Sequence, residues 1–181
     1  MYVLVEEKKA CFASGGRIRN KKEPAVIFIH GAGMDRTVWQ LQTRNIAYMG
    51  RQVFALDLPG HGRSQGPALS SIEKMADWVI HFMETVKLKR AKFIGHSMGA
   101  LVALEISSRY PQKVDKVCLM GVASKMPVHR DLLEAAKNNL SLASELIVSW
   151  GLGDNAQIGG HPLPGLWLNG SSKALLKNSL S

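Results

Sequence analysis

The chain has 181 residues, of which 46% are hydrophobic and 20% are charged, with 17 glycines and 7 prolines. A chain of this length buries about 70% of the surface that its unfolded form exposes, so it can build a substantial core. The composition excludes a collagen repeat, a low-complexity linker and an acidic disordered tail. We expect one domain with at most a small insertion.

The charge balance is strongly basic. Lysine and arginine number 23 against 14 acidic residues, which gives a formal net charge of +9. Such a balance can indicate nucleic-acid or anionic-membrane binding. Here the basic residues are dispersed, without interleaved aromatics, which favours a solvated surface. The sequence also lacks both the ~20 apolar residues that span a bilayer and a secretion-signal layout. We therefore expect a cytoplasmic protein with neither a nucleic-acid nor a membrane partner.

Two cysteines are too few for a disulfide framework or a four-cysteine zinc site. Cys11 and Cys118 each lie in an apolar run. This setting predicts that both are reduced thiols of a protein core.

Up to Gly121 the sequence predicts strands that alternate with helices. The predicted elements, in chain order, are strands 2–5 and 10–13, strand 25–29, helix 37–49, strand 53–56, a helix after Ser70, strand 92–94, a helix that Pro111 ends, and strand 116–120. The run at 25–29 is apolar throughout, which is typical of a strand covered on both faces. Strands alternating with helices indicate a mostly parallel sheet.

Two of the predicted helices carry clear local signals. Ser70 and Glu73 have the spacing of a capping box, with Ser70 as the N-cap of a helix whose apolar face includes Met75 and Met83. The helix before Pro111 is expected to bury Leu101, Val102, Leu104 and Ile106.

After Gly121 the strand pattern stops. Helices are expected over 129–150 and around 172–178, with a Gly/Pro-rich stretch between them. We interpret 122–181 as a helical excursion from the sheet.

The segment Gly95-His96-Ser97-Met98-Gly99 fits the G-x-S-x-G pattern of a nucleophile elbow. In that arrangement a serine on a sharp strand-to-helix turn projects its hydroxyl clear of the sheet. The flanking glycines are needed where backbones approach too closely for a Cβ atom. The N-terminus of the following helix directs free N–H groups towards developing negative charge.

A second match to the pattern occurs at Gly62–Gly66, with Ser64 at its centre. Ser97 directly follows a predicted strand and opens a long helix, whereas Ser64 lies in a loop before Pro67. We interpret the match at Ser64 as chance.

Two further loops follow predicted strands. The small residues of His30-Gly31-Ala32-Gly33 can turn a main-chain N–H towards the elbow, as an oxyanion hole requires. An ordinary glycine turn is the alternative. Asp57 opens the tight-turn sequence 57–64, where an aspartate most often holds its own loop.

These three segments, in this order and spacing, resemble the α/β-hydrolase family, and most closely its small cofactor-free esterases, lactonases and haloperoxidase-like hydrolases. The resemblance covers residues 1–121 and implies an α/β-hydrolase fold, a mostly parallel sheet with flanking helices. Residues 122–181 then correspond to the beginning of that family's helical cap. Serine at the elbow argues against the dehalogenase and epoxide-hydrolase branches, which place aspartate there.

The resemblance implies that Ser97 is the nucleophile. It places the oxyanion hole at the N–H groups of Ala32 and Met98, with Gly33 as the fallback. It also assigns loop-organising roles to His30 and Asp57 and a flanking position to His96. Neither a cofactor nor a metal is expected.

The sequence departs from the family where the triad's acid and histidine should follow the serine. No seventh or eighth strand is visible, so we expect a fold truncated after the sixth strand, with the acid and the histidine outside this chain. The remaining candidates are His129, His161, Asp115, Asp131 and Asp154, none of which follows a sheet strand in the required order. GLGDNA, from residue 151, mimics a dinucleotide fingerprint, but no periodic helix follows it.

Three hypotheses follow. The first is a serine hydrolase that acts on a small carboxylic ester, lactone or thioester. The second is a non-catalytic remnant or pseudoenzyme, and the third is a basic nucleic-acid-binding module. In addition, strand 116–120 is expected to form an unpaired apolar edge. That edge predicts aggregation, self-association, or the need for a complementary polypeptide.

Overall fold

The structure is a computed structural model that describes residues 1–17, 22–151, 172–174 and 176. It divides into two units, Met1–Ala123 and Ser124–Ser181. The division falls two residues after the predicted boundary at 121/122. The assignment of the second unit as a cap stays a prediction.

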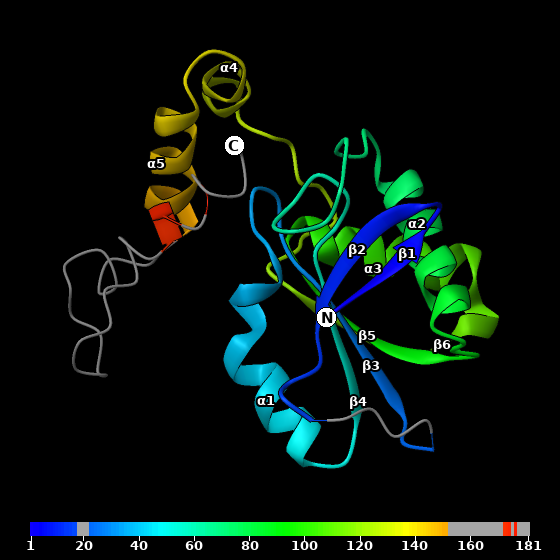
Figure 1. The fold of residues 1–181 in the computed structure, drawn as a ribbon. Coiled ribbons are helices and arrows are strands. Elements are labelled where there is room, and N and C mark those ends of the chain that lie inside the picture. The colour runs from blue at the N-terminus through cyan, green and yellow to red at the C-terminus, as the bar shows by residue number, and fades with distance from the viewer. Residues whose placement is uncertain (18–21, 152–171, 175, 177–181) are drawn as a thin grey trace. The chain divides into compact units, whose positions relative to one another are not determined.

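The first unit contains the strands and the helices that cover them (Figure 1). Its elements are β1 (Tyr2–Val5), β2 (Lys8–Ala13), β3 (Ala25–Ile29), a 3-10 helix (Arg36–Trp39), α1 (Gln40–Tyr48), β4 (Gln52–Leu56), α2 (Ile72–Thr85), β5 (Ala91–His96), α3 (Met98–Arg109), a 3-10 turn (Pro111–Lys113) and β6 (Val114–Met120). In the second unit the described helices include α4 (Arg130–Asn138) and α5 (Leu140–Gly151).

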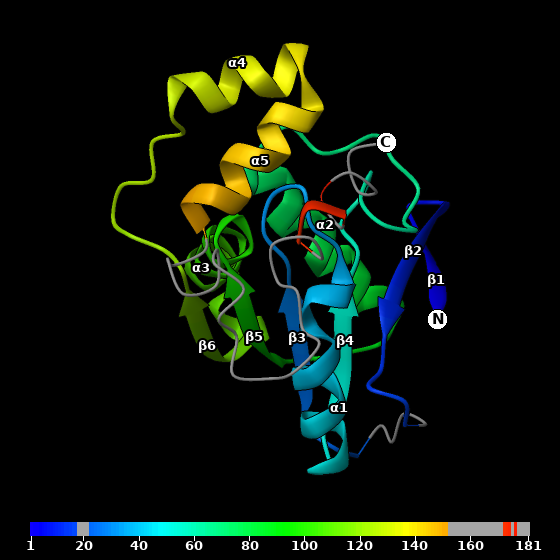
Figure 2. The same cartoon turned by 90° about the vertical axis from the view of Figure 1, so that its left-hand side faces the viewer.

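The six strands form one sheet in the order β1-β2-β4-β3-β5-β6. Figure 2 shows this order across the sheet, from β6 at one edge to β1 at the other. The pairs β3–β4, β3–β5 and β5–β6 are parallel, whereas β1–β2 and β2–β4 are antiparallel. The predicted mostly parallel sheet is therefore confirmed.

Helices lie on both faces of the sheet, with α1 on one face and α2 and α3 on the other (Figure 1). Because β3 and β4 are central, all five residues of each strand are buried. On the α2 face, the rings of Phe12, Phe54 and Phe82 pack with centroid separations of 5.5–5.7 Å. On the α1 face, Phe28 packs against Trp39 at 5.1 Å.

Helix α2 begins one residue later than predicted. Its N-cap is Ser71, whose hydroxyl accepts the N–H of Lys74 at 3.3 Å, so the prediction of Ser70 is wrong. Ser70 and Ser71 are chemically equal caps, and only the extended backbone at Ser71 (φ −148°, ψ 157°) decides between them. The predicted apolar face is confirmed, since Met75 and Met83 are buried.

Two burial predictions are wrong. Leu104 is 48% exposed, whereas Val102 and Ile106 of the same helix are buried as predicted. Cys11 is buried as expected, but Cys118 is exposed. The reason is that β6 is the edge strand, and an apolar run in an edge strand is not covered as it is in a central strand.

None of the helices in the described ranges is both long and apolar enough to cross a bilayer.

Candidate active site

Ser97 lies on the sharp turn between β5 and α3. Its backbone is left-handed, with φ 52° and ψ −119°, a conformation that costs a residue with a Cβ atom about 1–3 kcal/mol. Its neighbours hold the turn in place. The N–H of Ser97 donates to the carbonyl of Met120 at 2.8 Å, and its own carbonyl accepts the N–H of Ala100 at 2.9 Å. The last residue of β6 thus supports the turn.

The glycines on either side of the turn allow backbones to touch. A Cβ atom on Gly95 would lie 2.2 Å from the carbonyl oxygen of Gly99. One on Gly99 would lie 2.3 Å from the carbonyl oxygen of Ile29, the last residue of β3. Real Cβ atoms do not approach so closely, so both positions require glycine, as the pattern predicted. This packing brings the turn at Ser97 against the end of β3.

The loop after β3 runs beside Ser97. The N–H of Met34 donates to the carbonyl of Gly31 at 3.3 Å, which closes a turn in which Gly33 has φ +67°. A Cβ atom built on Gly31 would lie 3.4 Å from the Cβ of Ser97, so loop and serine are in van der Waals proximity. The N–H groups of Ala32 and Gly33, at the centre of this turn, make no hydrogen bond to the described residues.

Met98 follows Ser97 directly and is the first residue of α3. The N–H groups of a helix's first turn have no acceptor within the helix. They also carry the positive end of the helix dipole. An N–H donor therefore stands beside Ser97 on the α3 side, and further N–H donors stand in the loop after β3.

His30 organises the loop after β3. Its side chain is fully buried, and its Nε2 atom accepts the N–H of Leu58 at 3.1 Å. The Nδ1 atom therefore carries the proton and donates to the carbonyl of Gly31 at 2.8 Å. Burial lowers the pKa of His30 to about 4, so the ring is neutral at pH 7. A neutral imidazole thus ties the loop after β3 to the loop after β4.

Asp57 holds its own loop and the start of the 3-10 helix. Its buried carboxylate accepts the N–H of Arg36 at 2.8 Å and the N–H of Arg63 at 2.9 Å. It also pairs with the Arg36 guanidinium. A Cβ atom on Gly62 would lie 2.6 Å from this carboxylate. The carboxylate of Asp57 is therefore occupied by hydrogen bonds and an ion pair that hold the structure together.

The two serines of the repeated pattern differ in their hydroxyl partners. The hydroxyl of Ser64 donates to the carbonyl of Asp57 at 2.7 Å and accepts the N–H of Cys11 at 2.8 Å. It is therefore engaged with its own loop and with β2. The hydroxyl of Ser97 makes no hydrogen bond to the described residues.

The remaining triad candidates in the described part of the chain have other partners. Asp115 pairs with Arg90 at 2.7 Å on the protein surface. His129 caps α4, where its Nδ1 atom accepts the N–H of Asp131 at 3.3 Å. Asp154, His161 and most of the GLGDNA segment lie outside the described residues.

His96 has a role that the pattern did not reveal. A Cβ atom on Gly31 would lie 3.2 Å from its Nδ1 atom, and one on Gly121 would lie 3.2 Å from its Nε2 atom. The half-buried ring thus occupies the space between the loop after β3 and the residue after β6. Burial also lowers its pKa, so the ring is neutral at pH 7. In the sequence, the signal for this position of His96 would have been Gly31 and Gly121, which lie 90 positions apart.

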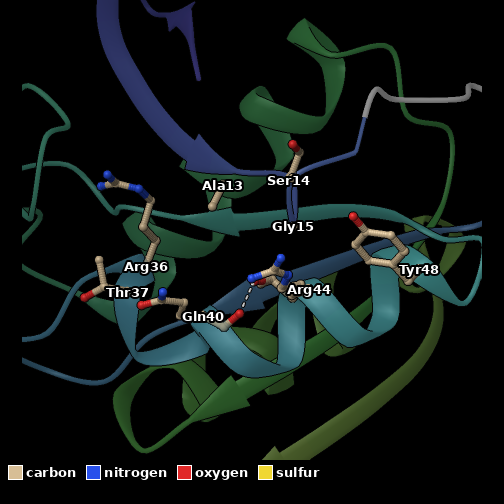
Figure 3. A pocket seen from close by; sticks show the side chains of 10 residues that line it. Ala13, Ser14, Gly15, Arg36, Thr37, Gln40, Arg44 and Tyr48 are labelled. Atoms are coloured by element: carbon tan, nitrogen blue, oxygen red, sulfur yellow. Dashed lines mark hydrogen bonds between the residues drawn. The ribbon is translucent and has the colours of Figure 1, made fainter.

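A cavity of about 360 Å³ lies beside α1. Figure 3 shows Gln40, Arg44 and Tyr48 of α1 among the residues that line it, with Ser14 and Gly15 across from the helix. None of the predicted site residues lines this cavity.

A mostly parallel sheet with helices on both faces, and a serine on a left-handed strand-to-helix turn, define the structural class of this protein. The chain belongs to the alpha/beta hydrolase fold family, whose sequence profile matches residues 24–157. The fold predicted from the sequence is therefore confirmed.

Curated relatives include hydrolases. Over 101 residues the chain is 35% identical to (E)-2-((N-methylformamido)methylene)succinate hydrolase of Acinetobacter baylyi, a match that covers 54% of this chain and 37% of that protein. Over 97 residues it is 40% identical to a dihydrolipoyllysine-residue acetyltransferase component of the acetoin cleaving system of Cupriavidus necator. This match covers 52% of this chain and 25% of that protein. The chain thus spans well under half the length of these relatives.

Solved structures show the same fold. An N-acyl homoserine lactone degrading enzyme superposes with a TM-score of 0.79 at 22% identity, over 99% of this chain and 67% of that one. The enol-lactonase from Burkholderia xenovorans gives a TM-score of 0.79 at 20% identity, over 99% and 68%. The chain corresponds to about two thirds of each of these proteins.

Proposed function

We propose that this protein is a serine hydrolase in which Ser97 attacks a carbonyl carbon. The observation that carries the proposal is the left-handed backbone of Ser97, held between two glycines that tolerate no Cβ atom. Strain of this kind is kept where the surrounding structure enforces it, and it is concentrated at functional sites. The Ser97 hydroxyl is also free of described partners, in contrast to that of Ser64.

The oxyanion that forms on attack needs two N–H donors. Met98 supplies the first, at the start of α3, and Ala32 supplies the second, from the loop beside Ser97. Gly33 is the fallback, because its N–H lies in the same turn and is equally without a described partner. His30 and His96 position this loop, the first through hydrogen bonds and the second by filling the space beside Gly31.

The substrate class that we propose is a small carboxylic ester, lactone or thioester. The hydrolase and lactonase names among the relatives support acyl chemistry of this kind. A general base must take the proton of Ser97. No histidine in the described ranges hydrogen bonds to the Ser97 hydroxyl, so we assign the base to a histidine outside them.

This absence of a described base also favours the second candidate, a non-catalytic remnant or pseudoenzyme. Hydrolysis of p-nitrophenyl acetate by the chain and by Ser97→Ala separates the two. Losing the base of a triad costs on the order of 10⁶ in kcat, while binding and the oxyanion hole retain about 10³–10⁴ over water.

We therefore expect slow turnover that Ser97→Ala lowers only slightly, because the members of a triad act as a unit. Fast turnover that Ser97→Ala abolishes would instead rule out the non-catalytic candidate. If His161→Ala also abolished it, His161 would be that base, contrary to the sequence-based expectation of a histidine outside this chain.

A further inference from the structure

Basic residues that are dispersed along the sequence lie together at one edge of the sheet. Strands β3, β4, β5 and β6 are parallel, so the connections that precede them lie at the same edge (Figure 2). These connections carry a set of basic residues, namely Arg51 before β4, Lys87, Lys89 and Arg90 before β5, and Lys113 before β6. We call this surface the cationic edge. It lies at the opposite end of the strands from Ser97, which follows β5.

The positive charge of the cationic edge is only partly compensated. Two of its residues form ion pairs with nearby acids, namely Arg90 with Asp115 at 2.7 Å and Lys113 with Glu84 at 3.7 Å. In contrast, Arg51, Lys87 and Lys89 are exposed and make no ion pair with the described residues. The edge therefore carries an excess of positive charge, which attracts an anionic surface.

Two large apolar side chains are exposed at the same edge. Helix α1 ends at Tyr48 and β4 begins at Gln52, so Tyr48 and Met49 lie in the connection that also carries Arg51. Each of these two side chains is 67% exposed. Tyrosine is enriched where a membrane meets water, and an apolar side chain gains free energy when it leaves water. Cations beside exposed apolar groups are typical of proteins that lie on an anionic bilayer.

We propose that the cationic edge docks on an anionic lipid bilayer, with Tyr48 and Met49 entering the headgroup region. Ser97 lies at the opposite end of the strands, so the docked protein presents the elbow to the solution and not to the lipid. The docking requires no catalytic role of Ser97. The sequence gave no reason to expect a membrane partner, because the basic residues are dispersed along it and only the parallel sheet brings them to one edge.

A bilayer fits the cationic edge better than other anionic partners do. A duplex nucleic acid would satisfy the cations, but it offers no apolar medium for Met49. An acidic protein holds its carboxylates at fixed positions, so binding it would order the side chains of Lys87 and Lys89 at an entropic cost. Lipid headgroups move laterally and can meet these side chains without ordering them.

The test is flotation of the full chain with lipid vesicles, because aggregated protein does not float. We expect the chain to float with vesicles that contain phosphatidylcholine and phosphatidylserine, and to stay behind with vesicles of phosphatidylcholine alone. Each basic residue near an anionic surface strengthens binding roughly fivefold. The triple variant Arg51→Gln, Lys87→Gln and Lys89→Gln should therefore bind on the order of 100-fold more weakly than the parent.

Two matched controls separate the cationic edge from the rest of the surface. The triple variant Lys8→Gln, Arg63→Gln and Lys74→Gln has the same net charge, but its exposed substitutions lie at the start of β2, after β4 and at the start of α2, at the opposite end of the strands. It should bind within about threefold of the parent, because charges more than ~10 Å from the lipid are screened at 0.1 M salt. Met49→Ser should weaken binding roughly fivefold, whereas Leu41→Ser, at a side chain that is 74% exposed at the other end of α1, should leave it unchanged.

Equal binding by the two triple variants, or equal flotation with the two kinds of vesicle, would overturn the proposal. Equal effects of Met49→Ser and Leu41→Ser would contradict the entry of Met49 into the headgroup region. Duplex DNA or polyglutamate, added to the bound chain at a charge concentration well below that of the phosphatidylserine, completes the test. Release by the DNA would assign the cationic edge to a nucleic acid, and release by polyglutamate would assign it to an acidic protein. Both outcomes contradict a lipid surface as the partner.

Discussion

Replacing Ser97 by glycine should make the protein more stable. The backbone at Ser97, with φ 52° and ψ −119°, costs a residue with a Cβ atom about 1–3 kcal/mol. Glycine adopts positive φ without that penalty. Glycine also has greater conformational freedom in the unfolded chain, which offsets about 0.4–1 kcal/mol of this stabilisation. The net expectation for Ser97→Gly is therefore an increase of about 1 kcal/mol in the free energy of unfolding.

Ser97→Ala is the matched control. Alanine keeps the Cβ atom and thus the backbone strain, and the hydroxyl that it lacks has no described partner. Its free energy of unfolding should stay within about 0.5 kcal/mol of the parent.

Urea unfolding followed by tryptophan fluorescence measures both variants. With a slope of about 2 kcal/mol/M, a gain of 1 kcal/mol moves the midpoint by about 0.5 M. If Ser97→Gly were destabilising, or if Ser97→Ala raised the midpoint equally, the turn would not be strained. The argument from strain to function would then fail.

Three further predictions concern stability and turnover. Folding holds the pKa of His30 at about 4 against 6.5 for a free histidine, so the unfolded chain binds more protons between these values. Stability should therefore fall by up to about 3 kcal/mol as the pH drops from 6.5 to 4, and His30→Gln should flatten this dependence in urea melts. Gly95→Ala should cost about 2 kcal/mol or more, whereas Gly151→Ala, with no neighbour within 4 Å, should be nearly neutral; equal effects would contradict the close packing at the elbow. Hydrolysis of p-nitrophenyl acetate should be slow and should change little in Ser97→Ala, and fast turnover that depends on Ser97 would show that a base is present in the chain.

The sequence predicted the elements whose signals are local. Strand β3 has the predicted bounds, because a short run that is apolar throughout has few alternatives between Pro24 and His30. The elbow could be distinguished from the second match by context alone, since Ser97 joins a strand to a helix whereas Ser64 does not. The glycine requirement at Gly95 and Gly99 followed from the same local geometry.

The predictions that failed depended on neighbours distant in the sequence. Cys118 is exposed because β6 lies at the sheet edge. An apolar run has the same sequence pattern in an edge strand and in a central strand, so the sequence does not distinguish the two. Leu104 is a different case: it lies two residues from Val102 and from Ile106, so the helical period itself places it on the opposite side of α3. His96 lies between Gly31 and Gly121, so three segments that are distant in the sequence come together there. A local sequence pattern does not predict such a contact.

Labelling with a fluorophosphonate probe tests most directly whether Ser97 is a nucleophile. In the protein that includes its catalytic histidine, incubation followed by peptide mapping should place the phosphonyl group on Ser97, and Ser97→Ala should lose the label. Ser64→Ala should retain it, because that hydroxyl only links Asp57 to Cys11. Labelling at Ser64, or labelling that persists undiminished in Ser97→Ala, would contradict the assignment of the nucleophile.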